Sequence, residues 1–369
     1  MLVMKSETKQ CQNCKQDFVI EPEDFNFYKK IKVPPPTFCP ECRLQRRFAF
    51  RNERNLYKRE CDLCQKSIIS NYSPKSEYVV YCPSCWHGDG WSPYDYGQDY
   101  DFSKTFFEQF VKLEKKIPRL GLLQENTINS PWVNYETDDK NCYLNFGGHF
   151  NQDCAYNQYA LKSRDCFDNF WIMKGEFSYE NILCENVYKT IGSRFCFETQ
   201  DVWFSFDCRN CSNIIGCSGL RHKSYCIFNK QVTKEEYEEF VKTHLNGSRK
   251  DFIELKKKAR KLWKECPQKA VSIDRSLGSS GHLIKDSKNC QDCFSVEKSE
   301  DLKHALYCLE SKDSMDITSI WQGELSCESI GGMSSSSILF TSSVLNQSAF
   351  IRYCNVIFGS SNCFGCSHL

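Results

Sequence analysis

The clearest pattern in the chain is a repeat of six residues that begins at Cys142. Every sixth residue from Cys142 to Ile214, and the residue three places after each, is uncharged, and the same holds from Cys290 to Gly359. Charged residues make up 26% of the chain, so chance does not explain this exclusion. A period of six fits neither an amphipathic helix nor a flat alternating strand. It predicts a β-solenoid in which each short strand sends one small residue inward and Asn, Ser or Gly turns the corner.

The pattern leaves the size of one coil open, because two, three or four groups of six residues would each close a turn. Asn and Gly tolerate the left-handed backbone that such corners need. Most of the cysteines after Cys142 fall at inward positions, where cysteine acts as a small, easily buried apolar residue. We therefore interpret most of these thiols as packing groups.

Helical periodicity appears in two segments outside the repeat. The first is predicted to run from Ser103, as the N-cap, to Ile117, and Pro118 ends it. Its stripe of apolar, mostly aromatic residues is typical of packing, and we expect it to dock the N-terminal region onto the repeat.

The second helical segment, residues 231–270, is predicted to form an αα-hairpin. Thr233 with Glu236 makes a capping box at its start. Ser248 caps a second helix that Pro267 ends.

Composition narrows the class of protein. The 369 residues include 48 Lys and Arg, 47 Asp and Glu, and 25 cysteines. A net charge near zero argues against a uniformly basic nucleic-acid coat. The chain contains neither a long apolar run nor an apolar signal core at its start, so we expect a cytoplasmic protein without membrane contact, whose thiols are reduced.

Four Cys-x-x-Cys pairs near the N-terminus carry the clearest chemistry. Two residues between thiolates let one tight turn present both sulfurs to one metal ion, and two such turns complete a tetrahedral zinc site without an open position for water. Disulfides are disfavoured in a reducing compartment. We therefore predict two structural zinc ions, bound by Cys11, Cys14, Cys39, Cys42, Cys61, Cys64, Cys82 and Cys85.

The spacing does not determine how the four pairs combine. Sequential use gives two zinc ribbons, whereas alternating use gives one cross-braced module. The pairs that begin at Cys39 and Cys82 each follow an aromatic residue, which is typical of a zinc-ribbon knuckle at the end of a strand. Zinc binding would contribute about 10–16 kcal/mol of folding free energy per structural site.

One later group of cysteines departs from the packing interpretation. Its close spacing, with His222 nearby, makes a third zinc site a candidate beside the packing alternative. The candidate ligands are Cys208, Cys211, Cys217 and Cys226.

A cationic stretch, residues 43–59, lies between the second and third cysteine pairs. Guanidinium groups suit phosphate oxygens, and the interleaved aromatic residues suit unstacked bases. A surface that binds protein, or one that only pairs with nearby acids, is the alternative. The residues predicted to contact nucleic acid, DNA or RNA, are Arg43, Arg46, Arg47, Arg51, Arg54, Lys58 and Arg59. A second cationic surface is predicted over residues 249–264, on the second helix of the hairpin.

Several segments together resemble one protein family. They are the cysteine pairs themselves, VPPPTFCPECRLQRRFAFRNERNLYKRECDLC, YCPSCW, DFSKTFFEQF, KNCYLNF and SYCIFNKQVTKEEYEEF. They resemble an uncharacterised zinc-ribbon plus cysteine-rich-repeat family of small-genome bacteria, over nearly the whole chain. The resemblance implies no activity. Members sometimes carry a CoA-transferase label, but this sequence has no alternating βα pattern of a nucleotide-binding sheet.

We expect a mainly β protein in which an N-terminal zinc-ribbon module with two four-cysteine sites precedes a hexad-repeat β-solenoid, and an αα-hairpin interrupts the solenoid. The predicted segments are a double zinc-ribbon module (1–90), an aromatic loop and docking helix (91–140), solenoid block 1 (141–230), the helical hairpin (231–270) and solenoid block 2 (271–369). The two blocks end in similar sequences, so a fragment of a longer array is an open alternative.

The preferred functional hypothesis is a zinc-stabilised scaffold that binds nucleic acid through the cationic stretch and the repeat surface. The sequence carries no motif of a known reaction, so no catalytic residue is predicted. One alternative is a protein-interaction scaffold with exposed aromatic residues, namely Trp171, Trp203 and Trp321. Another is an acyltransferase or carbohydrate-active enzyme on a solenoid, with a base among His149, His282 and His304.

Overall fold

Short strands, most of them parallel, are the main secondary structure of the computed structural model, which describes residues 5–369 and is mainly β. The chain divides into two units. Unit 1 contains the chain up to Asn52, Glu77–Arg119 and Lys269–Leu369, and unit 2 contains Glu53–Ser76 and Leu120–Gln268. Each unit therefore holds one of the two repeat blocks. The segment boundaries predicted from the sequence treat residues 1–90 as one module. The two units divide this segment, because Glu53–Ser76 belongs to unit 2.

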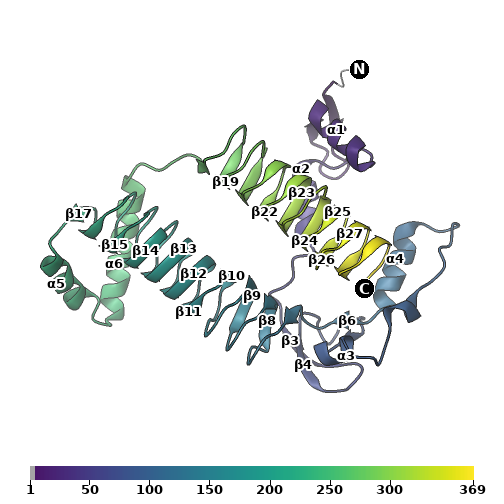
Figure 1. The fold of residues 1–369 in the computed structure, drawn as a ribbon, viewed down its shortest axis with the longest axis horizontal. Helices are drawn as coiled ribbons and strands as arrows, with labels where there is room; N and C mark the ends of the chain where they lie inside the picture. Colours follow the sequence, from purple (N-terminus) through teal and green to yellow (C-terminus); the bar gives the residue numbers. More distant parts are fainter. Residues whose placement is uncertain (1–4) are drawn as a thin grey trace. The chain divides into compact units, whose positions relative to one another are not determined.

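Unit 2 is built on an 11-stranded sheet (Figure 1). Its strands are β7 (Gln124–Glu125), β8 (Trp132–Thr137), β9 (Tyr143–His149), β10 (Gln158–Leu161), β11 (Arg164–Phe167), β12 (Phe170–Tyr179), β13 (Ile182–Ile191), β14 (Phe197–Trp203), β15 (Ser212–Ile215), β16 (Ser224–Ile227) and β17 (Lys230–Gln231). From β9 to β16 neighbouring strands are parallel and paired residues are 12 apart, as Ile172 and Cys184 are. An offset of 12 equals two of the predicted groups of six.

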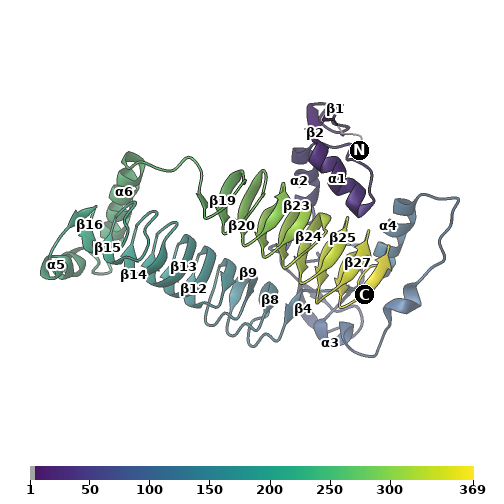
Figure 2. The same ribbon diagram turned by 45° about the horizontal axis from the view of Figure 1, so that its top comes forward.

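Unit 1 holds a 12-stranded sheet of the same kind, which Figure 2 shows in green to yellow. Its strands are β18 (Ile273–Asp274), β19 (Gly281–Lys285), β20 (Cys293–Glu297), β21 (Glu300–Lys303), β22 (Leu306–Leu309), β23 (Lys312–Trp321), β24 (Cys327–Met333), β25 (Ser336–Leu339), β26 (Ser342–Leu345), β27 (Ala349–Arg352), β28 (Asn355–Phe358) and β29 (Ser361–Phe364). The strands are again parallel, and Ile284 pairs with Val296 at an offset of 12.

The repeat buries at least every third residue along most of its length, and a left-handed residue precedes most of these regularly spaced buried positions. Tyr156, for example, has a φ of 61° and is exposed, whereas Asn157 beside it is buried. The prediction that Asn, Ser or Gly turns the corners is therefore wrong for most corners, because those side chains are buried. A left-handed L residue costs about 1–2 kcal/mol. Backbone hydrogen bonds to the strands on both sides offset that cost, as Gln152 N to Ser163 O (2.9 Å) and Asp153 N to Lys140 O (2.9 Å) do.

The predicted register fails near the end of block 2. Asn346 and Gln347 are both left-handed, which inserts one extra residue into the repeat. The offset between paired residues becomes 13, as between Ile338 and Ile351. As a result Ile351 is buried, whereas the predicted inward residue Phe350 is 57% exposed.

The cysteines of the repeat pack as the sequence predicts. Cys154, Cys166 and Cys196 are buried with 0–1% exposure. The thiol of Cys154 donates to the carbonyl oxygen of Gln152 at 3.2 Å, and that of Cys166 donates to Arg164 O at 3.2 Å. These weak hydrogen bonds give a donor to carbonyl oxygens two residues earlier in the chain, and the buried sulfur atoms act as small packing groups.

The helical hairpin of unit 2 forms as predicted. Its helices are α5 (Lys234–His244) and α6 (Arg249–Glu265). The Thr233–Glu236 capping box is present, and Ser248 caps α6. Trp263 anchors α6 on the sheet, because its ring nitrogen donates to Phe204 O at 3.0 Å.

Unit 1 contains four α-helices and a 3₁₀ turn within the described residues. They are α1 (Pro22–Ile31), α2 (Pro40–Phe48), α3 (Pro83–Trp86), η1 (Pro93–Tyr96) and α4 (Phe106–Lys116). The N-cap of α4 is Thr105 and not Ser103, whose hydroxyl binds Asp101 instead. Figure 2 shows α2 beside β23, and the two elements are in contact.

None of the helices in residues 5–369 has the length and apolar character needed to cross a bilayer.

Candidate metal centres and cationic surfaces

The first thiol cluster joins a hairpin to a helix. The strands β1 (Glu7–Gln10) and β2 (Asp17–Ile20) flank the turn that carries Cys11 and Cys14. Cys39 is the N-cap of α2, and Cys42 lies in its first turn. One sulfur from each of the four residues lies within 4.8 Å of the others.

Amide groups point at the sulfurs of this first cluster. Cys39 N donates to Cys11 Sγ at 3.3 Å, and the amide of the Asn13 side chain donates to Cys42 Sγ at 3.3 Å. Burial raises the pKa of the Cys11 thiol, but N–H groups of Cys39, Cys14 and Asn13 outweigh it and lower the pKa to about 6. Such donors favour thiolate, the form that binds metal.

The second cluster has the same plan. Cys61 and Cys64 lie in the turn between β3 (Tyr57–Glu60) and β4 (Ser67–Ser70). Cys82 and Cys85 follow β5 (Val80–Tyr81) at the start of α3, and the four sulfurs lie within 4.8 Å of one another.

The two clusters use the cysteine pairs sequentially and not alternately. In each cluster one pair lies in a hairpin turn and the other at the N-terminus of a helix, where Cys39 and Cys82 are N-caps. The predicted position at the end of a strand applies to Cys82, which follows β5, whereas residues 33–38 before Cys39 form no strand. Four cysteine sulfurs fit a structural zinc ion, which would link the two pairs and leave no position for a substrate.

The candidate third site does not assemble. In residues 5–369 only the two N-terminal groups bring three or more metal-binding side chains within 4.8 Å. The four candidate thiols occupy buried positions of the repeat and donate to backbone carbonyl oxygens, as Cys211 Sγ does to Arg209 O at 3.2 Å. They behave as the other packing cysteines do.

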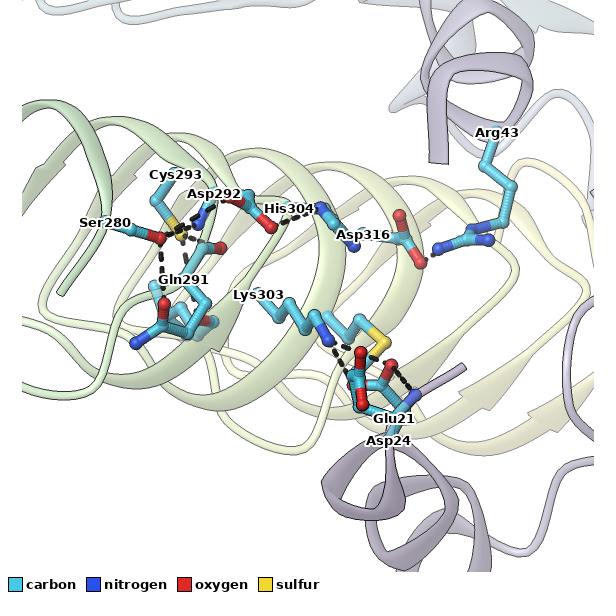
Figure 3. Close-up of polar contacts among 12 residues, drawn as sticks. Glu21, Asp24, Arg43, Ser280, Gln291, Asp292, Cys293, Lys303, His304 and Asp316 are labelled. Carbon is cyan, nitrogen blue, oxygen red and sulfur yellow. Dashed lines mark hydrogen bonds and ion pairs between the residues drawn. The ribbon is translucent and has the colours of Figure 1, made fainter. Parts of the chain in front are cut away.

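Two arginines of the cationic stretch are buried in unit 1. Arg43 and Arg47 are 2% and 3% exposed, and both bind the carboxylate of Asp316 on β23. The distances are 2.8 Å from Arg43 Nε and 3.3 Å from Arg47 Nη1, and Figure 3 shows the first of them. Burial opposes the charge on both groups. For Arg43, Asp316 together with Tyr28 and Glu328 outweighs burial and the pKa is raised, whereas for Arg47 burial prevails and the pKa is lowered.

Other cations of the stretch differ in exposure. Arg46 is exposed but bonded to Glu328, and Arg59 binds Asp62 at 2.8 Å. Arg54 and Lys58 are exposed and belong to unit 2.

Residues 53–58 contact block 1 within unit 2. The side-chain amide of buried Asn134 donates to Glu53 O at 3.0 Å. The guanidinium of Arg54 lies 5.6 Å from the ring centre of Phe146, and the ammonium of Lys58 lies 5.9 Å from that of Trp132.

This placement brings the two cationic segments together. A cavity of about 250 Å³ in unit 2 is lined by Arg54, by Arg260 of α6 and by Arg194 of the repeat. Tyr156, which is 52% exposed, lines the same cavity, as do two acids, Asp168 and Glu180. Arg194 and Tyr156 were not identified from the sequence. Neighbouring strands pair residues that are 12 apart, and without that offset the sequence does not indicate which exposed residues share a face.

The three tryptophans and three histidines of the alternative hypotheses lie in the two repeat blocks. Trp171, Trp203 and Trp321 are half-buried and not exposed. Burial and nearby Lys162 lower the pKa of His149, and burial lowers that of His304, although Asp316 opposes it.

Comparison with protein-family models finds no family that matches the chain, and comparison with curated proteins finds no matching relative.

Proposed function

We propose that the protein is a zinc-stabilised scaffold that binds single-stranded nucleic acid on unit 2. One observation carries this proposal: Arg54 and Arg260, from two separate cationic segments, line one cavity with Arg194 and exposed Tyr156. Guanidinium groups bind phosphate, and an aromatic ring stacks on an unpaired base.

In this proposal each repeat block is a β-solenoid with coils of 12 residues, or two groups of six. The offset of 12 between most paired residues supports it, as does the left-handed residue at nearly every third position. A solenoid presents equivalent side chains at regular spacing, which suits a backbone of repeating phosphates. The two four-cysteine groups would hold the N-terminal hairpins by binding zinc. The family resemblance remains an expectation.

The local charge around the cavity favours an anion. Three guanidinium groups line it against two carboxylates, and Glu180 is already bonded to Lys256. This leaves a local surplus of positive charge in a chain whose net charge is only +1.

The test is a titration of the full-length protein with fluorescent single-stranded DNA and RNA at two salt concentrations. Contacts from Arg54, Lys58, Arg194 and Arg260 would give a slope of log K against log salt of about −2.8, at about −0.7 per phosphate. Arg54→Ala with Arg260→Ala should weaken binding at least tenfold and make the slope shallower by about 1.4.

The control removes the same charge elsewhere on unit 2. Lys242 and Lys261 are exposed and lie outside the cavity lining, so Lys242→Ala with Lys261→Ala should change the affinity less than threefold. Binding that is absent, independent of salt, or equal in the two double variants would refute the proposal.

A further inference from the structure

A second and larger cavity lies entirely within unit 1. Its volume is about 640 Å³, within the range of small-molecule sites. Its walls come from α1, residues 33–38, α2, α4, the strands β23, β24, β26 and β28, and turns beside them. None of the residues that line the unit 2 cavity takes part in it.

One wall of this cavity is cationic. Arg43, Arg46 and Arg47 line it on α2, and they face two carboxylates, Asp316 and Glu328. Three guanidinium groups therefore share two counterions, and two of the three are buried. A zinc ion bound by four thiolates at the start of α2 would carry a net negative charge. The surplus of positive charge is therefore a local property of the cavity lining and not of unit 1 as a whole.

Another part of the lining is aromatic. The rings of Phe340 and Tyr353 are stacked, with centres 4.9 Å apart and planes 12° apart. Phe107 of α4 meets Tyr353 edge to face at 6.0 Å, yet it remains 62% exposed. The rings therefore leave apolar surface uncovered beside the cations.

We propose that this cavity binds a small aromatic anion, a planar ring that carries a phosphate-like group. Tyr353 and Phe107 would contact the ring, and Arg46 would bind the anionic group from the side that is exposed. Rings stack on aromatic side chains, and guanidinium groups form charge-assisted hydrogen bonds with phosphate. This proposal is independent of nucleic-acid binding by unit 2.

The test uses 1-naphthyl phosphate as the ligand and follows its intrinsic fluorescence during titration of the full-length protein. Two half-ligands, 1-naphthol and inorganic phosphate, separate the contributions of the ring and the anion. We expect saturable binding of 1-naphthyl phosphate and at least tenfold weaker binding of either half-ligand. Competition by adenosine monophosphate would identify a nucleotide as one member of the class.

Paired variants locate the binding site. Phe107→Ala and Arg46→Gln should each weaken binding about tenfold, which corresponds to about 1.4 kcal/mol. Phe102→Ala removes a ring that is 92% exposed and outside the cavity, and it should leave the affinity unchanged. Thermal unfolding and zinc content of each variant show whether it is folded.

Three results would overturn the proposal. They are the absence of saturable binding to 1-naphthyl phosphate, equal binding of 1-naphthol, and affinity that survives both Phe107→Ala and Arg46→Gln. The unit 2 variant Arg54→Ala with Arg260→Ala should bind 1-naphthyl phosphate normally. Binding of 1-naphthyl phosphate and binding of nucleic acid are therefore tested separately. Failure of one leaves the other proposal standing.

Discussion

Asn169 and Asn181, 12 residues apart, are joined through one oxygen atom. Asn169 Oδ1 accepts a hydrogen bond from Asn181 N at 2.9 Å and another from Asn181 Nδ2 at 3.0 Å. Asn169 makes the same two bonds to Asn157 on its other side. All three side chains are buried, so the ladder satisfies polar groups that water does not reach. Because each amide needs a partner at an offset of 12, the ladder also favours one register of the strands.

Breaking this ladder should destabilise unit 2. Asn169→Ala removes four buried side-chain hydrogen bonds, each worth about 0.5–1.5 kcal/mol, and leaves the backbone N–H of Asn181 without its acceptor, whereas Asn181 Nδ2 keeps Thr190 O at 2.7 Å. We expect a loss of about 3–5 kcal/mol in the free energy of unfolding, measured by urea denaturation. Asn210 is exposed at a left-handed corner, so Asn210→Ala should cost less than about 1 kcal/mol. Equal losses in the two variants would contradict the ladder's role.

Stability should fall in acid because of His368. This imidazole is buried, and burial, together with nearby Arg119, lowers its pKa to about 3. The unfolded state, with a pKa near 6.5, binds the proton first, so stability is constant above that pH and falls as the pH decreases towards 3. The slope from this group reaches about 1.4 kcal/mol per pH unit.

The measurement for His368 is denaturant unfolding at pH 7.5 and pH 5. The variant His368→Gln should show a smaller loss between the two values than the unchanged protein. The prediction fails if both proteins lose the same stability.

Removal of the charge at Glu136 should stabilise the protein. Burial raises the pKa of Glu136 well above its usual value, and neighbouring Asp139 raises it further. The stability present at low pH is therefore lost as the pH rises through the pKa of the folded state. Glu136→Gln should raise the free energy of unfolding at pH 8 by at least about 1 kcal/mol, and the gain should disappear at pH 4. Exposed Glu198→Gln is the matched control, and a gain that does not depend on pH would count against this account.

Metal content tests the thiol clusters directly. Purified protein should contain two zinc ions per chain by mass spectrometry or colorimetric assay. Cys42→Ser should reduce this to about one ion and destabilise α2, because metal binding supplies folding free energy. Cys208→Ser should leave two ions, since Cys208 lies in the repeat and outside both clusters. A third ion that is lost in Cys208→Ser would contradict the structure.

Local chemistry explains why some features were predictable. The Cys-x-x-Cys pairs, the Thr233–Glu236 capping box and the Ser248 N-cap each act over a few residues, so spacing alone reveals them. The repeat was visible because charged side chains are excluded from every third position over residues 142–214 and 290–359. Its true period of three was harder to see, since the left-handed corners accept residues as different as Tyr156 and Leu144.

Long-range contacts were not predictable. Arg43 and Arg47 look like free cations in the sequence, and their partner Asp316 lies about 270 residues away. The extra residue at Asn346 and Gln347 changes the offset between paired strands from 12 to 13. The residue types there do not differ from those in the rest of the repeat, so the sequence gives no sign of it. Sequential pairing of the cysteine turns also required three-dimensional distances.

The sequence by itself determined the four Cys-x-x-Cys pairs, the uncharged positions of the repeat and the helical hairpin, because each depends on side chains that are close along the chain. Only the tertiary structure decided which cations remain available and which aromatic residues share a cavity with them. The reason is physical: burial and ion pairing depend on the whole surroundings of a side chain, and those surroundings come from segments far apart in the sequence.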